Sequence, residues 1–328
     1  MKRLRWERGL QRLWYGRSPW LPFLLPLSWL FCALVQLRRA AYRRGLLSPA
    51  ALDARVIVVG NISVGGTGKT PMVIELAGRL RRAGFKVGIL CRGYGGRSPQ
   101  WPLAVTGVSE PELAGDEAVL LAARSGVPVF AGPDRVAAGR ALLAQCSCDL
   151  VICDDGLQHY RLHRDLEIVL VDARRGHGNG HCLPAGPLRE PVSRLRRVDA
   201  VVGVGGAAAG GFGMRLHAGA AQRLVDPTDR RPLERFRDHR VHAVAGIADP
   251  RRFFATLREA GLEIQEHAFP DHHPFRAGEL AFGDARPVLM TEKDAVKCAG
   301  FAQAHWWSVP VDAQLDAAFV DWLIGSLN

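Results

Sequence analysis

The chain has 328 residues, of which 48% are hydrophobic and 23% charged, a composition that excludes a disordered chain, a collagen and a multi-span membrane protein. Its formal net charge is +11, but residues 1–50 carry ten Lys and Arg side chains against a single acid, Glu7. The rest of the chain is therefore close to neutral, which argues against a nucleic-acid-binding protein.

The first predicted element is the apolar segment WLPFLLPLSWLFCALVQL at residues 20–37, which lies between two groups of basic residues. It is slightly shorter than the roughly 20 residues of a spanning helix, and Pro22 and Pro26 interrupt its first half. Its aromatic residues and flanking arginines favour a helix on an anionic membrane surface, although the length does not separate a spanning helix from an interfacial one. A secretory signal is disfavoured because RRAAYRR follows instead of a cleavage site. A helix packed on the body of the protein is the alternative.

From residue 55 onward, short β-branched runs alternate with helical segments, which predicts an α/β fold whose parallel sheet has helices on both faces. The predicted strands are 55–59, 86–90, 127–130, 149–154, 167–172, 199–204, 242–246, 287–291 and 307–311. The predicted helices are 70–83, 116–125, 134–145, 250–260, 293–299 and 313–327. The Gly/Ala-rich stretch 203–214 predicts an internal boundary, and the polar region that continues to residue 240 predicts a linker between two lobes.

A phosphate-binding loop is predicted at residues 60–71, GNISVGGTGKTP, between the first strand of the body and its first helix. In such a loop, backbone N–H groups surround a polyphosphate, a lysine reaches the outer phosphates and a hydroxyl helps to hold Mg²⁺. We assign the nucleotide to Ser63, Val64, Gly65, Gly66, Thr67, Gly68, Lys69 and Thr70, with the Thr70 hydroxyl on the metal. Ser63 stands where the usual pattern G-x-x-x-x-G-K-[ST] has its first glycine.

The strand at 149–154 ends in two adjacent carboxylates, Asp154 and Asp155. Residues at the carboxyl end of a parallel strand face the ligand crevice, where carboxylates can hold Mg²⁺. We therefore predict that this pair contributes to a magnesium site. A helix cap or a turn is the alternative interpretation.

Eight motifs occur along the chain in a characteristic order. They are GNISVGGTGKTP (60–71), CRGYGGR (91–97), GDEA (115–118), GPDR (132–135), CDDGLQHYRLHRDLEIVLVD (153–172), LPAGPLREP (183–191), FPDHHPF (269–275) and TEKDAVK (291–297). In this order they resemble the tetraacyldisaccharide 4′-kinase family, from about residue 20 to about residue 320. The resemblance implies an enzyme of lipid A biosynthesis that transfers the γ-phosphate of ATP to the 4′-hydroxyl of a tetraacylated glucosamine disaccharide 1-phosphate.

The resemblance also implies a P-loop kinase fold in four parts. They are a membrane-associated N-terminal helix in residues 1–50, a nucleotide-binding lobe at 51–205, a linker expected to be a β-ribbon at 206–240, and a smaller α/β lobe at 241–328. A tetraacylated lipid stays in the bilayer, because each buried CH₂ contributes about 0.8 kcal/mol. We therefore expect a peripheral or monotopic protein on the cytoplasmic face of the inner membrane, without an obligate protein partner. Seven cysteines without a CxxC pair agree with this reducing compartment.

Phosphoryl transfer to a sugar requires a group that accepts the proton of the hydroxyl. The resemblance implies that Asp116 and His272 are this acceptor and its partner, brought together by closure of the two lobes; the adjacent His273 is the alternative to His272. It further implies catalytic and binding roles for Lys69 on the phosphates, Asp155 and Glu190 on Mg²⁺, Gln158 as an orienting group, and Arg135 and Arg189 near the transferred charge. Surface or lobe-packing positions are the alternatives for Arg135, Asp155, Gln158, Arg189 and Glu190.

Two other classes of protein remain as rivals. One is a P-loop nucleotide-switch ATPase or GTPase that acts on a protein or metal-centre partner; the membrane-seeking N-terminus and the lack of a CxxC or His-rich segment argue against it. The other is a membrane-binding module without catalysis, which would not need the predicted Mg²⁺ site. In TEKDAVK, Thr291 replaces the Asn of the guanine-binding motif N-K-x-D, and Asp294 directly follows Lys293, so guanine specificity is not expected.

Overall fold

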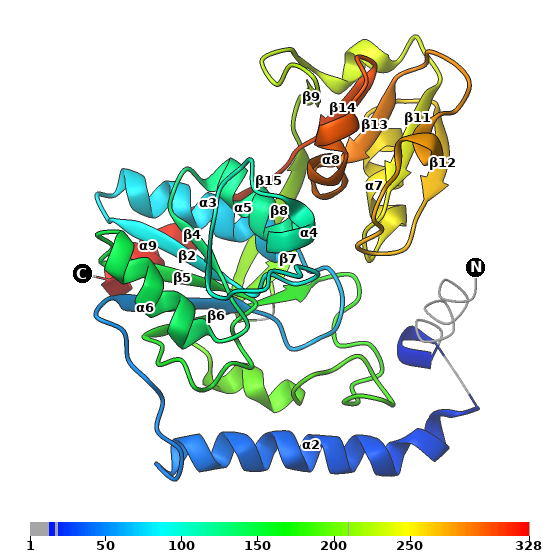
Figure 1. Cartoon of the computed structure of the whole chain (residues 1–328). Helices are drawn as coiled ribbons and strands as arrows, with labels where there is room; N and C mark the ends of the chain where they lie inside the picture. Colours follow the sequence, from blue (N-terminus) through cyan, green and yellow to red (C-terminus); the bar gives the residue numbers. More distant parts are fainter. Residues whose placement is uncertain (1–12, 17–18, 209, 328) are drawn as a thin grey trace.

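The computed structural model describes residues 13–16, 19–208 and 210–327, and within them the strands form two sheets (Figure 1). A nine-stranded sheet and a six-stranded sheet lie in two lobes, and a long helix, α2, runs along the base of the first lobe (Figure 1). The basic residues Lys2, Arg3, Arg5, Arg8, Arg12 and Arg17, which contribute to the expected membrane attraction, lie outside the described residues.

The nine-stranded sheet has the order β15-β8-β7-β6-β1-β5-β2-β4-β3. Its strands are β1 (Arg55–Gly60), β2 (Val87–Cys91), β3 (Leu103–Val105), β4 (Val129–Ala131), β5 (Leu150–Asp154), β6 (Leu166–Asp172), β7 (Ala200–Val204), β8 (Phe212–Ala218) and β15 (Val311–Leu315). The strands from β8 to β4 are parallel, and only the edge strands β3 and β15 pair antiparallel. The predicted parallel sheet is confirmed, and its continuous apolar central strands are typical of a sheet buried on both faces.

Helices cover both faces of this sheet. One face packs on α3 (Lys69–Arg82), α5 (Asp116–Ser125) and α9 (Ala317–Leu327), through buried side chains such as Met72, Leu121 and Phe319. The other face packs on α6 (Arg135–Gln145) and on the segment that contains Leu157 and Leu188. The short helix α4 (Pro111–Ala114) and the 3₁₀ helix Val192–Arg197 complete the lobe. The carboxyl ends of β1, β2, β4, β5 and β6 therefore meet at one edge, which is where ligands bind in such sheets.

The six-stranded sheet has the order β10-β9-β14-β13-β11-β12. Its strands are β9 (Ala221–Arg223), β10 (Arg230–Arg231), β11 (Val241–Ala245), β12 (Ile264–Ala268), β13 (Val288–Thr291) and β14 (Trp306–Val309). Its helices are α7 (Pro250–Glu259) and α8 (Glu292–Cys298), with 3₁₀ turns at Leu233–Phe236, Ala277–Leu280 and Ala299–Phe301. This smaller lobe touches the larger one through α5 and α8, where Arg124 of α5 forms ion pairs with Glu292 of α8 and Asp312 of β15.

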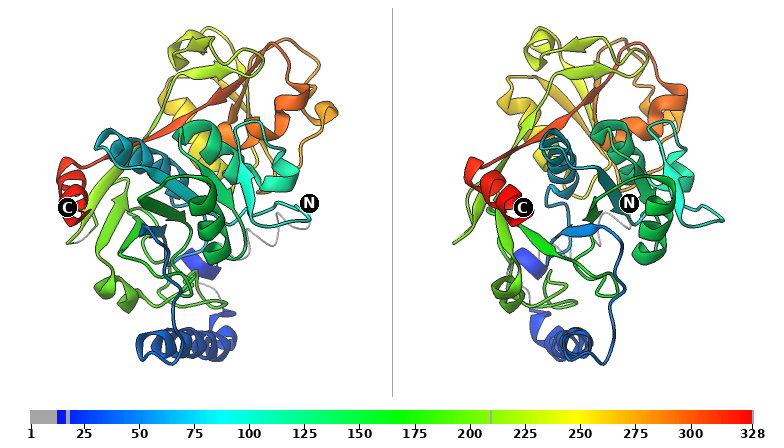
Figure 2. Two further views of the ribbon diagram at one scale, coloured as in Figure 1. Left: turned by 60° about the vertical axis from the view of Figure 1, so that its left-hand side comes forward. Right: turned by 90° about the vertical axis from the view of Figure 1, so that its left-hand side faces the viewer.

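The C-terminus differs from the sequence-based expectation. The helix predicted over 313–327 begins only at Ala317, and residues 311–315 form β15, which pairs with β8 in the nine-stranded sheet. Residues 311–327 thus return from the smaller lobe to the larger one, although the sequence analysis assigned all of 241–328 to the smaller lobe (Figure 2). The pattern VDAQL alternates as a strand should, but its partner lies about a hundred residues earlier in the chain, and local periodicity carries no information about such a partner.

The region predicted as a linker, 206–240, is divided between the two sheets. It contains β8 of the larger sheet and β9 and β10 of the smaller one, so the crossing between lobes is made by β8 and β15 together. The short strands β3, β9, β10 and β12 were not predicted, because two to five residues are too few to establish a clear alternation.

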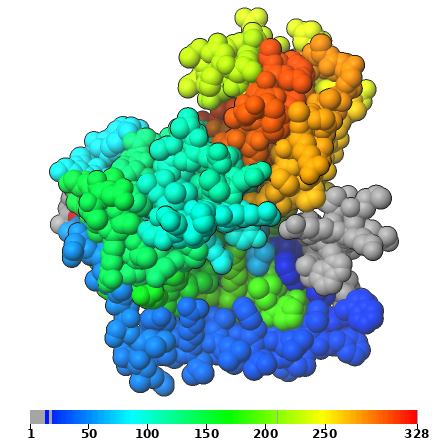
Figure 3. Space-filling view, in the orientation of Figure 1, coloured from blue at the N-terminus to red at the C-terminus, as the bar shows by residue number. Residues whose placement is uncertain are grey.

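Helix α2 (Leu21–Arg43) is longer than the predicted apolar segment. Pro22 does not interrupt it, because a proline in the first turn needs no intrahelical hydrogen bond, whereas Pro26 lies inside the helix. Its mean hydropathy of 1.5 over 18 residues would allow it to cross a membrane, and only 6% of that window is buried. Figure 3 shows α2 as a separate bar along the base of the molecule.

One side of α2 attaches to the larger lobe. The buried Ser28 hydroxyl donates to the carbonyl oxygen of Cys182 at 2.7 Å, and Phe31 and Cys32 pack against the core on that side. The opposite side carries five exposed side chains at the three- and four-residue spacing of one helical face, Phe23, Leu27, Leu30, Leu34 and Leu37. We call these five residues the exposed stripe.

Candidate active site

The phosphate-binding loop follows β1 and ends at α3, as predicted. Gly68, the last residue before α3, has φ 77°, a conformation that glycine adopts without strain. Asn61 shapes the loop from within, because its side-chain amide donates to the Thr67 hydroxyl at 3.0 Å and its oxygen accepts from Lys69 Nζ at 3.1 Å. The Lys69 ammonium is thereby held over the loop, where it can reach a bound phosphate.

The segment 182–190 supports the loop from outside. The Val64 amide donates to the Pro187 carbonyl at 2.8 Å, the Arg189 amide donates to the Ile62 carbonyl at 2.6 Å, and Ser63 forms an antiparallel bridge with Leu188. Ser63 does not have a positive φ. The replacement of the usual first glycine is therefore compatible with this backbone. Residues 63–67 line a small pocket together with Tyr15, Asp172, Arg175 and Gly176.

The two carboxylates at the end of β5 have opposite electrostatic environments. Asp154 is almost fully buried, and its Oδ1 has no hydrogen-bond partner. Burial, followed by the negative charge of Glu117, raises the pKa of Asp154 to about 7. Burial would also raise the pKa of Asp155, but the charges of Lys69 at 3.3 Å and Arg189 at 3.2 Å outweigh it and lower the pKa to about 2. The end of β5 therefore holds Asp155 as an anion paired with two cations, and Asp154 as a buried carboxyl with an oxygen that has no hydrogen-bond partner.

This arrangement fits Mg²⁺. The unpartnered Asp154 oxygen, the adjacent Asp155 and the Thr70 hydroxyl are oxygen ligands of the kind that Mg²⁺ prefers. Among the described residues, no group of three or more His, Cys, Asp and Glu side chains could hold a metal ion. A site with one or two carboxylates is typical of Mg²⁺ that is shared with the phosphates of a substrate.

Glu190 lies behind these carboxylates and is fully buried. Its Oε1 accepts from Gln158 Nε2 at 2.9 Å, and its Oε2 accepts from the Tyr160 hydroxyl and lies 3.3 Å from Arg194 Nε. Both oxygens are thus occupied by protein donors, and in this structure Glu190 anchors Gln158 and Tyr160 instead of presenting a free oxygen to a metal. The expected direct role of Glu190 on Mg²⁺ is not supported by this geometry.

The other predicted polar residues divide into two groups. Gln158 donates to the Asn61 carbonyl at 3.1 Å, and Arg189 contacts Asp155 and Gln158, so both lie beside the phosphate-binding loop. Arg135 is buried, and its guanidinium donates to the carbonyl of Gly132 at 2.8 Å. Arg135 thus supports the loop after β4, and its charge also acts on Asp154 at the end of β5; its expected role near the transferred charge stays a prediction.

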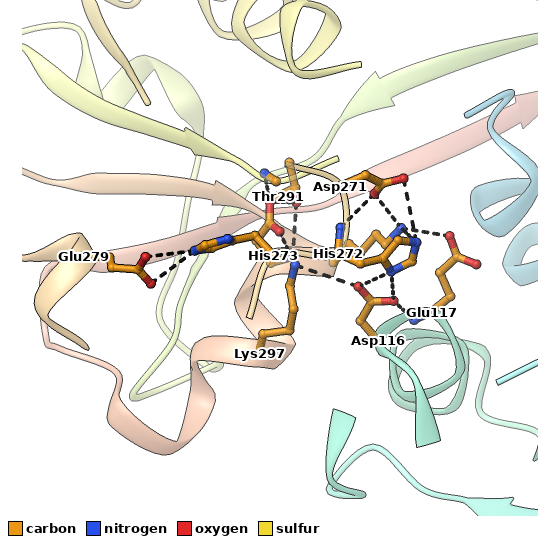
Figure 4. A network of polar contacts seen from close by, with 11 residues as sticks. Asp116, Glu117, Asp271, His272, His273, Glu279, Thr291 and Lys297 are labelled. Carbon is orange, nitrogen blue, oxygen red and sulfur yellow. Dashed lines mark hydrogen bonds and ion pairs between the residues drawn. The ribbon is translucent and has the colours of Figure 1, made fainter. Parts of the chain in front are cut away.

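The second half of the site joins the two lobes. Asp116 is the first residue of α5 in the larger lobe, and His272 lies in the loop after β12 in the smaller lobe (Figure 4). Both oxygens of Asp116 lie 3.0 Å from His272 Nδ1. Burial would raise the pKa of Asp116, but the hydrogen bond with His272 and the charges of Lys293 and Lys297 outweigh it and hold the pKa below its ordinary value. Asp116 is thus an anion positioned by an imidazole.

The structure distinguishes His272 from His273. His273 turns to Glu279, whose two carboxylate oxygens lie 3.1 Å from its Nε2 (Figure 4). His272 has φ 57°, and Asp155 has φ 48°; among the described residues these are the non-glycine residues with positive φ. Such a conformation costs about 1–3 kcal/mol and is found at functional sites. Both halves of the candidate site therefore contain a strained residue.

Sequence reasoning missed three residues of this site. Asn61 is the second residue of the loop motif 60–71, and its amide is suited to bridge two other loop residues, so the motif itself contained the signal. Tyr160 lies in the motif 153–172, but nothing local indicates its contact with Glu190. Lys293 lies in TEKDAVK, which the sequence analysis compared with a base-binding motif; the structure places it at the Asp116–His272 pair, where its Nζ lies 3.2 Å from His272 Nε2.

Three comparisons relate this chain to known proteins. The family model described as Tetraacyldisaccharide-1-P 4′-kinase matches residues 20–328. Tetraacyldisaccharide 4′-kinase of Nitrosococcus oceani is 53% identical over 308 residues, which are 94% of this chain and 91% of that protein. The protein of the same name from Alkalilimnicola ehrlichii is 52% identical over 97% of this chain and 96% of its own length. A crystal structure of LpxK from Aquifex aeolicus in complex with ATP is similar with a TM-score of 0.81 at 30% identity, over 94% of this chain and 99% of that one.

Proposed function

Because the chain belongs to the tetraacyldisaccharide-1-P 4′-kinase family, we propose that its two-lobed site carries out phosphoryl transfer from ATP, with Asp116 as the proton acceptor. The protein is an ATP-dependent lipid kinase that transfers the γ-phosphate of ATP to the 4′-hydroxyl of a tetraacylated disaccharide 1-phosphate in lipid A biosynthesis. The comparisons do not favour a nucleotide-switch ATPase or GTPase.

The observation that carries the proposed mechanism is the contact between Asp116 and His272 across the two lobes. The lobes meet beside the edge of the sheet that holds the phosphate-binding loop, and Glu117, the neighbour of Asp116, is close enough to raise the pKa of Asp154. The proton acceptor and the nucleotide site are therefore electrostatic neighbours.

In the proposed reaction, the 4′-hydroxyl gives its proton to Asp116 as its oxygen attacks the γ-phosphorus of ATP. The Lys69 ammonium stabilises the charge that develops on the transferred group, and Arg189 and Gln158 keep Asp155 and the loop in place. Asp154, Asp155 and Thr70 would hold Mg²⁺, which when bound neutralises phosphate charge.

The proposed reaction is tested with purified full-length protein, γ-labelled ATP and a tetraacylated disaccharide 1-phosphate in detergent. We expect label in the lipid, in proportion to the ADP formed. Release of free phosphate without labelled lipid would instead indicate a nucleotide switch, and the absence of both products would indicate a binding module.

We further propose that the exposed stripe of α2 attaches the enzyme to the cytoplasmic face of the inner membrane, where the lipid substrate lies. The stripe side chains are 55–75% exposed, and each contributes about 1.5–3 kcal/mol when buried in an apolar phase. Arg38, Arg39, Arg43 and Arg44 follow in the same segment and would favour anionic lipid.

Replacing Leu27 and Leu34 of the stripe with lysine should therefore weaken sedimentation with anionic phospholipid vesicles by more than tenfold. Turnover of substrate in vesicles should fall, while turnover of detergent-dispersed substrate should be retained. The matched control replaces Val108 and Val225, which are exposed elsewhere on the protein, with lysine. Equal sedimentation of the two double variants would exclude the stripe as the attachment surface.

A further inference from the structure

The motif TEKDAVK supplies a largely buried lysine, with 14% of its side chain exposed, that the proposed reaction does not yet use. Lys293 lies in α8, which begins after β13 with Thr291 as its N-cap. Its ammonium lies 3.0 Å from Glu117 Oε1, 3.2 Å from Asp271 Oδ1 and 3.2 Å from His272 Nε2. An ammonium has three N–H donors and no acceptor, so each donor has one partner here. His272 Nε2 must therefore accept, and it carries no hydrogen.

The other ring nitrogen of His272 has the opposite requirement. Nδ1 lies 3.0 Å from both oxygens of Asp116, and an ionised carboxylate can only accept. Nδ1 must therefore carry the hydrogen. From this geometry we propose that Lys293 is a positioning residue that fixes His272 as the neutral tautomer with its hydrogen on Nδ1. The proposal rests on the proposed function of Asp116 and His272, since it assigns how their pair is set.

The charges around the imidazole explain why Lys293 is needed to keep the ring neutral. Two carboxylates lie near the imidazole, those of Asp116 and Asp271, and a third, that of Glu117, contacts Lys293; the Tyr94 ring lies against the imidazole at an angle of 50°, with centroids 4.7 Å apart. Without a further cation, three anions would favour an imidazolium. Lys293 and Lys297 supply the positive charge instead; Lys297 Nζ lies 3.8 Å from Asp116 and 2.6 Å from Asp294.

Lys293 is well suited to remain charged. Burial would lower its pKa, but the carboxylates of Glu117, Asp116 and Asp271 outweigh burial and raise the pKa above the ordinary value. A second hydrogen on His272 Nε2 would face this ammonium across 3.2 Å, whereas the nearby carboxylate oxygen, Asp271 Oδ2, lies 3.7 Å from Nε2 and its partner Oδ1 accepts from Lys293. The lysine thus opposes protonation of the ring at the nitrogen it contacts.

The tautomer determines where the substrate proton goes. With a neutral ring, Asp116 receives one hydrogen bond from Nδ1 and remains free to take the proton of the 4′-hydroxyl. The new bond joins the hydroxyl oxygen to the γ-phosphorus, the bond to the β-phosphate oxygen breaks, and ADP leaves with that electron pair. An imidazolium beside Asp116 would instead lower the basicity of the carboxylate and slow this step.

The tautomer is measured directly by ¹⁵N NMR of the full-length protein with ¹⁵N-histidine, with the His272 signals assigned by their loss in His272→Gln. In the wild type near pH 7 we expect a protonated Nδ1 and an unprotonated Nε2. A wild-type spectrum with the hydrogen on Nε2, or on both nitrogens, overturns the proposal without any variant.

The variant Lys293→Met removes the donor to Nε2. We expect a hydrogen on Nε2 at the same pH, a kcat lowered by about 10²-fold and an unchanged KM for ATP. We also expect the kcat of the variant to rise with increasing pH, because an imidazolium beside Asp116 lowers the basicity of the carboxylate, while the wild type stays flat because Asp116 is already ionised. Lys293→Arg, which keeps a charged donor, should restore the wild-type ¹⁵N pattern.

Lys86→Met is the matched control, because Lys86 is exposed at the start of β2, at the opposite end of the strand from the ligand crevice. It should match the wild type in both the spectrum and the pH profile. An unchanged His272 spectrum in Lys293→Met would contradict the proposal even if kcat fell. Full lipid phosphorylation by Asp116→Asn would contradict the proposed function instead, whatever the spectrum shows.

Discussion

Asp116→Asn is expected to lower kcat for lipid phosphorylation by about 10²–10⁴-fold, the contribution typical of a positioned general base. The amide has the same shape as the carboxylate but cannot take up the proton of the 4′-hydroxyl. Asp116 lies outside the phosphate-binding loop, so the dissociation constant for ATP should stay within about twofold of wild type. Initial rates with labelled ATP and calorimetric titration of ATP measure the two quantities.

The two histidines of FPDHHPF provide the comparison for this result. His272→Ala removes the hydrogen bond to Asp116 and should also lower kcat by orders of magnitude. His273→Ala removes a contact to Glu279 in a half-exposed loop and should stay within about threefold of wild type. Near-normal turnover in Asp116→Asn and His272→Ala would discard this pair as the proton acceptor.

The second large effect is expected for Lys69→Met, which should lower kcat/KM for ATP by about 10³-fold or more. The variant loses the ammonium that reaches the phosphates, and Asp155, now paired with Arg189 alone, lies close to the phosphate anions. Unlike Asp116→Asn, it should weaken ATP binding as well as turnover.

Lys69→Arg separates charge from shape in this loop. A planar guanidinium does not reproduce a compact ammonium held by Asn61 and Asp155, so we expect at most partial recovery. Lys86→Met is again the control for removal of a lysine. ATP affinity within a few-fold of wild type in Lys69→Met would contradict the assignment of this loop.

The nucleotide half of the site was predictable because its signals are local. The apolar strand β1, the loop and α3 are continuous in sequence, and the helices α3, α5, α6, α7 and α8 begin and end within one residue of the prediction. Asp154 and Asp155 were predictable for the same reason, since the end of a buried strand fixes the edge of the sheet at which they lie.

The pairing of Asp116 with His272 was not predictable from the sequence pattern alone. Asp116 and His272 are separated by 156 positions, and the resemblance to a known family was needed to pair them. The role of Lys293 was not predicted even with that resemblance, because its three partners belong to one helix and one loop that meet only in the folded molecule. The strand β15 was not predicted for a related reason, because an alternating five-residue pattern does not reveal which strand it pairs with.

The return of β15 and α9 to the larger lobe has a consequence for synthesis of the protein. Until residues 311–327 leave the ribosome, β8 remains an edge strand without β15, and the apolar surface that receives Phe319, Leu323 and Leu327 stays uncovered. The nascent larger lobe must therefore wait for the complete smaller lobe to be translated before it can close. A stop codon that removed residues 311–327 would damage the ATP-binding half of the enzyme, although these codons follow those of the other half.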